Sequence, residues 1–383
     1  MKIDSTSYAF TKLRSSAKSD LKITEIDQRC RQVGLYAIVV WLIMTLASYA
    51  IGYHKQCIER LSGMERQAPL TAMMLMGMSV VSNILPMAYR WNKGERMTGV
   101  ITAGLVVQFI AFTTSTMLCT LPVPVFVDPV TGSRVFALRW SEWTPLAYVM
   151  TFLTEACHID STKMDSSQHA HTTNKNNSNN NNADKTIERS DSNIDNTCSS
   201  AYSLALCQGL STFCGYMFPH IEIQPLWIIT MILSCLLFST IYFRLYKRYN
   251  RFQQMSPGTS IGEQEMYNWA RVSLGLLSTC SALWSCLVIA YFIYSFGPLI
   301  FDSLSFLRTK GVVMIAECFI DVLFKSVYLH LIIDVHKTIF DPNARAQRRL
   351  EELRQVRNNV YIINHHHSFI IKYSSLNIFT HNP

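Results

Sequence analysis

Long apolar runs dominate this sequence and limit what it can fold into. A helix needs about 20 apolar residues to cross the hydrocarbon core of a bilayer. Eight stretches reach or approach that length, at residues 34–53, 70–90, 99–122, 137–156, 199–219, 224–246, 270–297 and 310–336. Only 16% of the residues are charged, which is low for a water-soluble protein. The chain is therefore predicted to be an all-α, multi-pass membrane protein.

The positions of the basic residues predict how the helices are oriented. Loops on the cytoplasmic side of a membrane are enriched in lysine and arginine. If the N-terminus is cytoplasmic, the inner segments hold 23 of these residues and the outer segments hold 6. Both termini are thus expected in the cytoplasm, with residues 1–33 as a polar cytoplasmic segment. Basic residues beside membrane helices also explain the net charge of +8 without a nucleic acid partner.

Three polar segments lie outside the predicted helices. Residues 160–198 are rich in asparagine and too polar to bury a core, so we expect a disordered cytoplasmic loop. Residues 337–360 are strongly charged, with apolar residues at helical spacing. This segment is expected to be a cytoplasmic linker helix, either the start of a parallel coiled coil or a solvated helix. Residues 361–383 show no period and are expected to form an unstructured tail.

Ionisable residues inside membrane helices are costly and usually mark functional sites. In the stretch 310–336, Asp321 precedes Lys325 by four residues, which places both on one face about one turn apart. Burial of a lysine disfavours the ammonium and favours the free amine, which condenses with aldehydes. A protonated Schiff base there would be a buried cation, and Asp321 is placed to neutralise it. Glu317, one turn away on the same face, is a second acid near the site.

A second pair of charges lies in the stretch 137–156. Arg139 and Glu142 are three residues apart and share one helical face. Because charges facing lipid are prohibitive, both should point into the bundle, where Glu142 can face Lys325. The charges alone also fit an ordinary interhelical ion pair that fixes packing.

Aromatic residues favour a ligand pocket near these charges. Trp143, Trp227, Trp284 and Tyr291 lie in the predicted helices, and the last two are seven residues apart, hence on one face. Rigid aromatic walls suit a long conjugated polyene. Taken singly, each of these residues also fits an ordinary packed core or interface position.

Three motifs together resemble the microbial (type I) rhodopsins: IDVLFK at 320–325, RWSEW at 139–143 and WSCLVIAY at 284–291. In that family the last helix has an aspartate four residues before the retinal-binding lysine. The third core helix carries an Arg-x-x-Asp/Glu-Trp counterion motif, and the sixth is rich in tryptophan. The likeness covers residues 70–336, and it implies a seven-helix rhodopsin bundle preceded by one extra N-terminal transmembrane helix at 34–53.

The resemblance also implies a cofactor and its attachment. Lys325 would form a Schiff base with retinal, expected to be the all-trans isomer. Glu142 and Asp321 would be the counterions, and Arg139 would lie beneath them.

Further residues would line the retinal pocket by the same resemblance. Those enclosing the polyene would be Trp143, Trp284 and Tyr291. Those near its ring end would be Gly215, Trp227 and Thr230, with Gln208 on the same helix as Gly215. Leu287 and Val288 replace the tyrosine and proline that are common in pumps, which puts that wall of the pocket in doubt.

The layout of eight helices with a cytoplasmic N-terminus resembles the enzyme rhodopsins, in which the opsin is fused to a histidine kinase, cyclase or phosphodiesterase. The segment RRLEELRQVRNN at 348–359 resembles the linker into the dimerisation helix of histidine kinase rhodopsins. No kinase or cyclase sequence follows in the chain. We therefore expect a sensor portion rather than an enzyme, a homodimer in membrane lipid that signals through 337–360 to a kinase or cyclase module.

Two other functions stay open. A proton pump of this family has a carboxylate eleven residues after the counterion, where this chain has Leu153, and Glu155 lies on a different face. The stretch 99–122 also lacks the row of acidic residues expected of a channel, so transport is disfavoured. A transporter without retinal, coupling ions through the same buried charges, is the third interpretation, although no convincing internal repeat supports it.

Overall fold

The computed structural model describes residues 5–92, 98–173, 183–256, 261–301, 303–304, 306 and 311–340. The chain divides into two units. Residues 1–333 hold a helical bundle and a small sheet, whereas the second unit, 334–383, is described only over 334–340, the end of the last helix. Most of the predicted linker helix and the whole predicted tail therefore lie outside the described residues.

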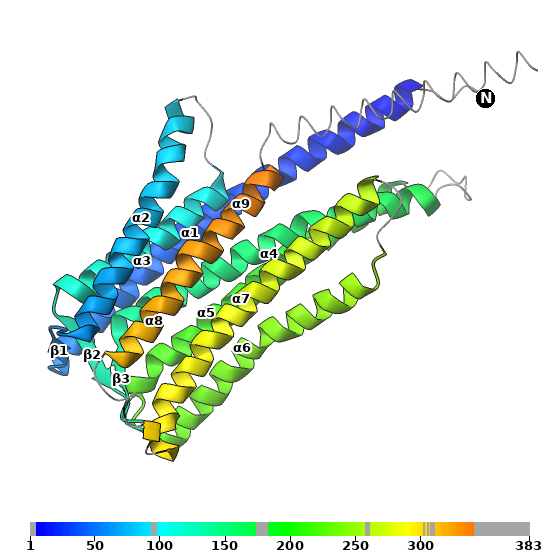
Figure 1. Cartoon of the computed structure of the whole chain (residues 1–383). Helices are drawn as coiled ribbons and strands as arrows, with labels where there is room; N and C mark the ends of the chain where they lie inside the picture. The colour runs from blue at the N-terminus through cyan, green and yellow to red at the C-terminus, as the bar shows by residue number, and fades with distance from the viewer. Residues whose placement is uncertain are drawn as a thin grey trace, which may run out of the picture. The chain divides into compact units, whose positions relative to one another are not determined.

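Long helices build the first unit and run roughly side by side (Figure 1). Seven of them are α1 (Ser5–His54), α2 (Met64–Asn92), α3 (Gly99–Thr120), α4 (Ala137–Thr173), α5 (Ala183–Met217), α6 (Gln224–Gln253) and α7 (Ile261–Ile300). The eighth consists of α8 (Val312–Val322), a π-helical segment η3 (Leu323–Tyr328) and α9 (Leu329–Phe340). A short 3-10 helix, η1 (Phe218–His220), follows α5. The described residues thus confirm the predicted all-α fold class, with one helix preceding a set of seven.

The protein is an integral membrane protein. Within the described chain, the helices long and apolar enough to cross a bilayer are Ile26–His54, Met64–Leu85, Gly99–Thr120, Gln224–Gln253 and Tyr267–Ile300. The predicted crossings in α4 and α5 are less apolar, and the one in α8–α9 is divided by the π-helical segment into helices that are each too short to cross a bilayer. Two of them carry the charged residues that the sequence singled out, and α5 is rich in serine. These three helices are the ones whose polar residues need partners inside the bundle.

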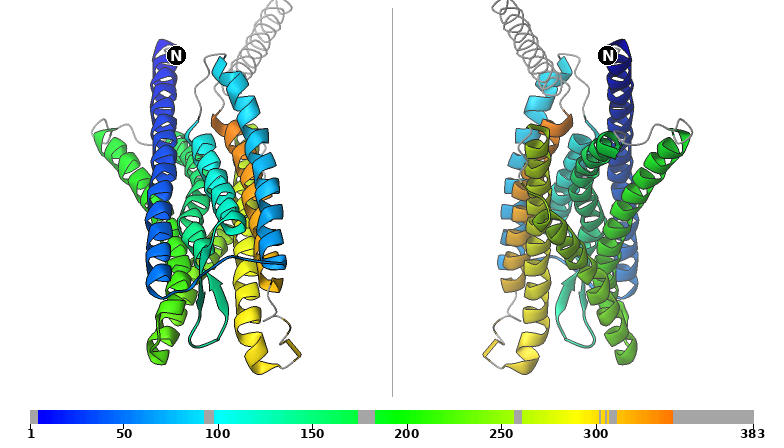
Figure 2. Two further views of the ribbon diagram at one scale, coloured as in Figure 1. Left: turned by 90° about the vertical axis from the view of Figure 1, so that its left-hand side faces the viewer. Right: turned by 90° about the vertical axis from the view of Figure 1, so that its right-hand side faces the viewer.

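A small antiparallel sheet lies at one end of the bundle. Strand β1 (Ile58–Glu59) pairs with β2 (Val123–Val127), which pairs with β3 (Arg134–Phe136). Figure 2 shows the hairpin at the end of the bundle opposite to the start of α1. The sequence did not predict this sheet, because strands of two to five residues are too short to show an alternating pattern between long apolar runs.

Several helices extend beyond their predicted bounds, and here the structure differs from the predicted disordered loop. Helix α4 continues to Thr173 and α5 begins at Ala183, so much of 160–198 is helical. No glycine or proline occurs in this stretch, so nothing breaks the helices that enter it from both sides. The asparagine run falls in 174–182, outside the described residues. Helix α1 likewise begins at Ser5, inside the predicted polar N-terminal segment.

Hydrogen bonds from Trp41 and Ser48 link the extra helix α1 to the rest of the bundle, and we call these contacts the polar seam. Many of its buried residues recur every three or four positions along one face, among them Cys30, Val33, Ala37, Trp41, Met44 and Ser48. Trp41 Nε1 donates to Thr114 Oγ1 of α3 at 3.1 Å. Ser48 Oγ lies 2.9 Å from Ser141 Oγ of α4 and 3.1 Å from the Tyr216 hydroxyl of α5. Helix α1 is therefore an integral part of the bundle.

Gly311 fixes how the lysine-bearing helix begins. Its φ of +104° lies in the left-handed region that favours glycine. An added Cβ would lie 2.4 Å from Met64 Cβ at the start of α2. Helix α8 therefore starts in close contact with α2, which holds the residues that follow in register with the bundle.

Candidate functional site

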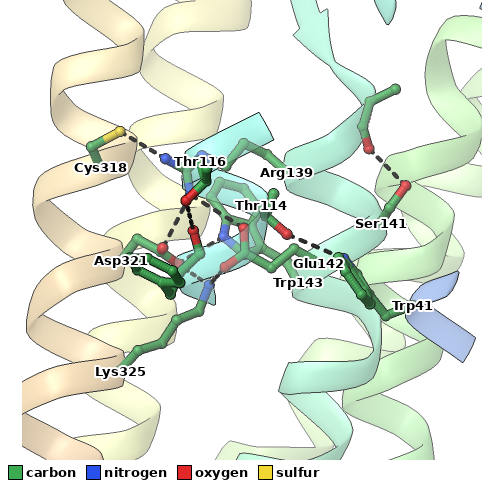
Figure 3. A network of polar contacts seen from close by, with 12 residues as sticks. Trp41, Thr114, Thr116, Arg139, Ser141, Glu142, Trp143, Cys318, Asp321 and Lys325 are labelled. Carbon is green, nitrogen blue, oxygen red and sulfur yellow. Dashed lines mark hydrogen bonds and ion pairs between the residues drawn. The ribbon is translucent and has the colours of Figure 1, made fainter. Parts of the chain in front are cut away.

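Lys325 lies inside the π-helical segment Leu323–Tyr328, and its side chain is only 3% exposed. Short π-helical stretches are rare and occur frequently at functional sites. The Lys325 amine forms ion pairs with Glu142 of α4 and Asp321 of α8 (Figure 3). The two acids predicted to face this lysine therefore do so, from two different helices.

Arg139 binds the same two acids. Its Nη1 donates to Glu142 Oε2 and to Asp321 Oδ2, each at 3.2 Å, and its Nη2 donates to Cys318 Sγ at 2.8 Å. The side chains of Arg139 and Glu142 are 0% exposed, and that of Asp321 is 2% exposed. Two cations thus compensate two anions in a buried cluster, which offsets the cost of removing these charges from water. We call Arg139, Glu142, Asp321 and Lys325 the charge cluster.

Trp143 orients one carboxylate of the charge cluster. Its Nε1 donates to Asp321 Oδ1 at 3.0 Å, and the same oxygen contacts the Lys325 amine. Asp321 therefore contacts three donors, from Arg139, Trp143 and Lys325. Charge-assisted hydrogen bonds of this kind fix geometry as well as energy, so the carboxylate is held in place before any ligand arrives.

Aromatic rings pack beside the lysine-bearing segment and beside Trp143. Trp284 of α7 packs edge-on against Phe324, the residue before the lysine, with ring centroids 4.7 Å apart. Trp140 lies between Trp143 and Tyr291, at centroid distances of 5.4 and 5.6 Å. The three aromatic residues predicted to enclose a polyene are thus all buried in the interior of the bundle.

The lack of a side chain at Gly215 leaves room for the Trp140 ring. A Cβ on Gly215 would lie 1.9 Å from Cζ3 of the Trp140 ring, which is confined by Trp143 and Tyr291. We expect Gly215→Ala to lower the free energy of unfolding by about 1–3 kcal/mol, because overpacking forces the rigid ring to move. Thermal unfolding of the detergent-solubilised protein measures this change.

The matched control is Gly275→Ala in α7. Nothing lies within 4 Å of a Cβ at that position. Alanine has a higher helix propensity than glycine, so this variant should gain up to about 1 kcal/mol. If the two variants had equal stability, the close contact between Gly215 and Trp140 would be refuted.

Two predicted pocket residues have their described contacts elsewhere. The amide of Gln208 on α5 reaches Thr240 Oγ1 at 3.3 Å and two backbone carbonyls of α6 at 3.4 Å. The hydroxyl of Thr230 donates to Leu226 O within α6 at 2.8 Å. Gln208 therefore links α5 to α6, and neither residue has a described contact with the charge cluster.

Trp227 is joined to Tyr291 through an intervening ring. Its Nε1 donates to Asp128 Oδ2 in the β2–β3 turn at 3.2 Å. Its ring packs on Phe218 with centroids 5.1 Å apart, and Phe218 stacks on Tyr291 at 6.0 Å. Trp227 thus ties the hairpin to the aromatic interior, and its place beside a ligand stays a prediction.

The structure adds residues that the sequence analysis did not select. Cys318 accepts from Arg139, and Trp140 fills the space beside Gly215. Cys318 lies three residues before Asp321, so helical spacing was a usable signal. Glu317 is mostly buried one turn from Asp321, as predicted, and its Oε2 has no hydrogen-bond partner among the residues that the structure describes.

Two solved structures of a rhodopsin are similar to this chain. Both come from the rhodopsin phosphodiesterase of Salpingoeca rosetta. Its transmembrane domain is 14% identical, covers 79% of this chain and 97% of that chain, and has a TM-score of 0.43. The transmembrane domain with its linker region is 13% identical, covers 86% and 97%, and has a TM-score of 0.48. No protein-family model and no curated protein sequence matches the chain.

Proposed function

We propose that the chain is a retinal-binding sensory photoreceptor. The main support is the buried amine of Lys325, which lies between the carboxylates of Glu142 and Asp321 with Arg139 bound to both. A buried lysine with compensating acids is the group required for a stable imine with an aldehyde. Retinal supplies a conjugated chain that absorbs visible light and isomerises.

The residues present fit this cofactor. A protonated imine carries the same single positive charge as the ammonium of Lys325, so the charge cluster stays neutral after the bond forms. Trp284 packs on Phe324 beside the lysine and Trp143 contacts Asp321, so rigid apolar rings lie close to Lys325. Tyr291 belongs to the same buried aromatic group through Trp140. Asp321 keeps its orientation through Trp143 whichever form the amine takes.

The charge cluster also supports a sensory role. Glu142 belongs to α4, whereas Asp321 and Lys325 belong to the helix formed by α8 and η3. Any change in the position or charge of the Lys325 nitrogen alters the ion pairs that hold these helices together, and this shifts a balance between two helix arrangements. We propose that the shift is passed along α9 to the cytoplasmic linker 337–360.

The proposal includes the surroundings of the chain. Both termini are placed in the cytoplasm, because lysine and arginine concentrate on that side. The linker then lies where a kinase or cyclase module acts, and a homodimer in the membrane would bring two linkers together. Cross-linking of membranes that contain the full chain, with and without light, tests the dimer.

Reconstitution tests the chromophore directly. Adding all-trans retinal to the purified full chain should produce an absorption band to the red of free retinal. Borohydride reduction should then leave a retinyl group on the peptide that contains Lys325, as read by mass spectrometry. Retinol, which lacks the aldehyde, is the matched control and should give neither result. A chain that forms no band with retinal would instead fit an ion-coupled transporter.

A further inference from the structure

A second buried charge cluster joins α4 to α6. Glu155 of α4 is 1% exposed and forms ion pairs with two arginines of α6. Arg244 donates from Nε and Nη2 to Glu155 Oε2, at 3.2 and 3.0 Å. Arg248 Nη2 lies 2.6 Å from Glu155 Oε1. A single carboxylate thus holds two successive turns of α6.

Arg248 extends this contact to a third helix. Its Nη1 donates to Ser273 Oγ of α7 at 3.0 Å and lies 3.4 Å from the Ser273 carbonyl oxygen. The Arg248 side chain is 5% exposed, so its charge depends on these partners rather than on water. The buried guanidinium of Arg248 on α6 therefore links α4 and α7 to its own helix.

A layer of hydroxyl groups connects this cluster to the lysine-bearing segment. Tyr328 is the last residue of η3, three residues after Lys325. Its hydroxyl lies 2.7 Å from Thr154 Oγ1 of α4 and donates to the Leu276 carbonyl of α7 at 2.9 Å. Thr154 directly precedes Glu155 in α4. Leu276 follows Ser273 by three residues, so the two layers are about one helical turn apart.

We infer that these two layers form one polar junction, made of Thr154, Glu155, Arg248, Ser273 and Tyr328, that couples the lysine-bearing segment to α6. The inference rests on the proposed function, because it names the route by which a change at the lysine reaches a neighbouring helix. If Tyr328 moves, it loses its hydrogen bonds to the Leu276 carbonyl on α7 and the Thr154 hydroxyl on α4. Both groups lie next to the ion pair between Glu155 and Arg248. A buried ion pair is stable when its partners are in contact and costly when they are partly separated. The junction therefore favours two discrete arrangements of α6, one with the Glu155 ion pairs formed and one with them broken.

Hydrogen exchange in the full chain without retinal tests this coupling. Tyr328→Phe removes the hydroxyl and keeps the ring, so residues 244–251 of α6 should exchange their amide hydrogens roughly three- to tenfold faster. Tyr216→Phe is the matched control. It also removes a tyrosine hydroxyl with a hydrogen bond inside the bundle, to Ser48, but lies outside the junction. Unchanged exchange at 244–251 in Tyr328→Phe would overturn the inference.

A double variant separates coupling from general loosening. Glu155→Gln should by itself speed exchange at 244–251, because it removes the charge that holds both arginines. If Tyr328 and Glu155 act through one junction, adding Tyr328→Phe to Glu155→Gln should produce less than the product of the two single effects. Effects that simply multiply would show two independent contacts and refute the junction.

The two proposals fail in different experiments. If retinal forms no visible band but the exchange effects are less than multiplicative, the photoreceptor proposal fails and the junction stands as a coupling element. If the band forms but Tyr328→Phe leaves residues 244–251 unchanged, the chromophore assignment stands and the junction is refuted.

Discussion

Replacement of Lys325 by alanine should abolish the visible band that forms when all-trans retinal is added to the purified protein. The expected effect is a complete loss, because alanine has no amine to condense with the aldehyde. In the described chain, Lys325 supplies the amine that contacts Glu142 and Asp321. Absorption spectra of wild type and variant, at equal protein and retinal concentrations, give the measurement.

Two controls make this result specific. Lys247→Ala removes an exposed lysine of α6 and should keep the full band. Retinal supplied to Lys325→Ala as a preformed imine of a small alkylamine should restore absorption, because Glu142 and Asp321 remain to hold the positive charge. A band of wild-type size in Lys325→Ala with retinal alone would show that the pigment is attached elsewhere.

The second large effect is expected at Arg139, and it concerns stability. Arg139→Gln leaves two buried carboxylates with one cation among the described residues, because the remaining ion pairs of Glu142 and Asp321 are those with Lys325. Removing one partner of a buried ion pair destabilises a protein by about 3–5 kcal/mol. Chemical or thermal unfolding of the protein without retinal should show this loss.

Arg31→Gln is the comparison for Arg139→Gln. Arg31 pairs with Asp27 at 3.2 Å, but its side chain is 45% exposed. Exposed ion pairs contribute about 1 kcal/mol or less, so this variant should unfold close to wild type. Similar losses at Arg31 and Arg139 would mean that the charge cluster contributes no more than a surface ion pair.

Local spacing was enough to predict the centre of the site. Asp321 and Lys325 are four residues apart, and Arg139 and Glu142 are three residues apart, so a helix places each pair on one face. Lipid excludes charge, which leaves the interior of the bundle as the place where the two faces meet. In the structure the two faces do meet, because Glu142 forms ion pairs with Arg139 on its own helix and with Lys325 on the other.

Contacts between distant helices were not predictable in the same way. The sequence gives no spacing rule that pairs Gly215 with Trp140, because their contact depends on how two helices cross. Glu155 was compared with the counterion along its own helix, where it lies on a different face. Its true partners, Arg244 and Arg248, are four residues apart on α6, and that spacing was a signal in the sequence.

For Gln208 and Thr230 a place in the retinal pocket stays a prediction. Both were assigned by likeness to a family, and not from any property of their neighbours. Their described hydrogen bonds are made between α5 and α6 and within α6. Polar side chains in a membrane bind the nearest acceptor, and that acceptor depends on side chains from helices far away in the sequence.

The polar seam of α1 has a consequence for biogenesis. During synthesis α1 leaves the ribosome before α4 and α5, and until those helices follow, the Ser48 hydroxyl can donate within its own helix, to the Met44 carbonyl oxygen at 2.7 Å. Once α4 and α5 are inserted, Ser141 and Tyr216 give Ser48 polar contacts that lipid cannot supply, which favours packing of α1 on these helices over its separation into the bilayer. A chain without this first segment would lose the hydrogen bond between the Tyr216 hydroxyl and Ser48, and the helix faces that α1 now covers would meet acyl chains.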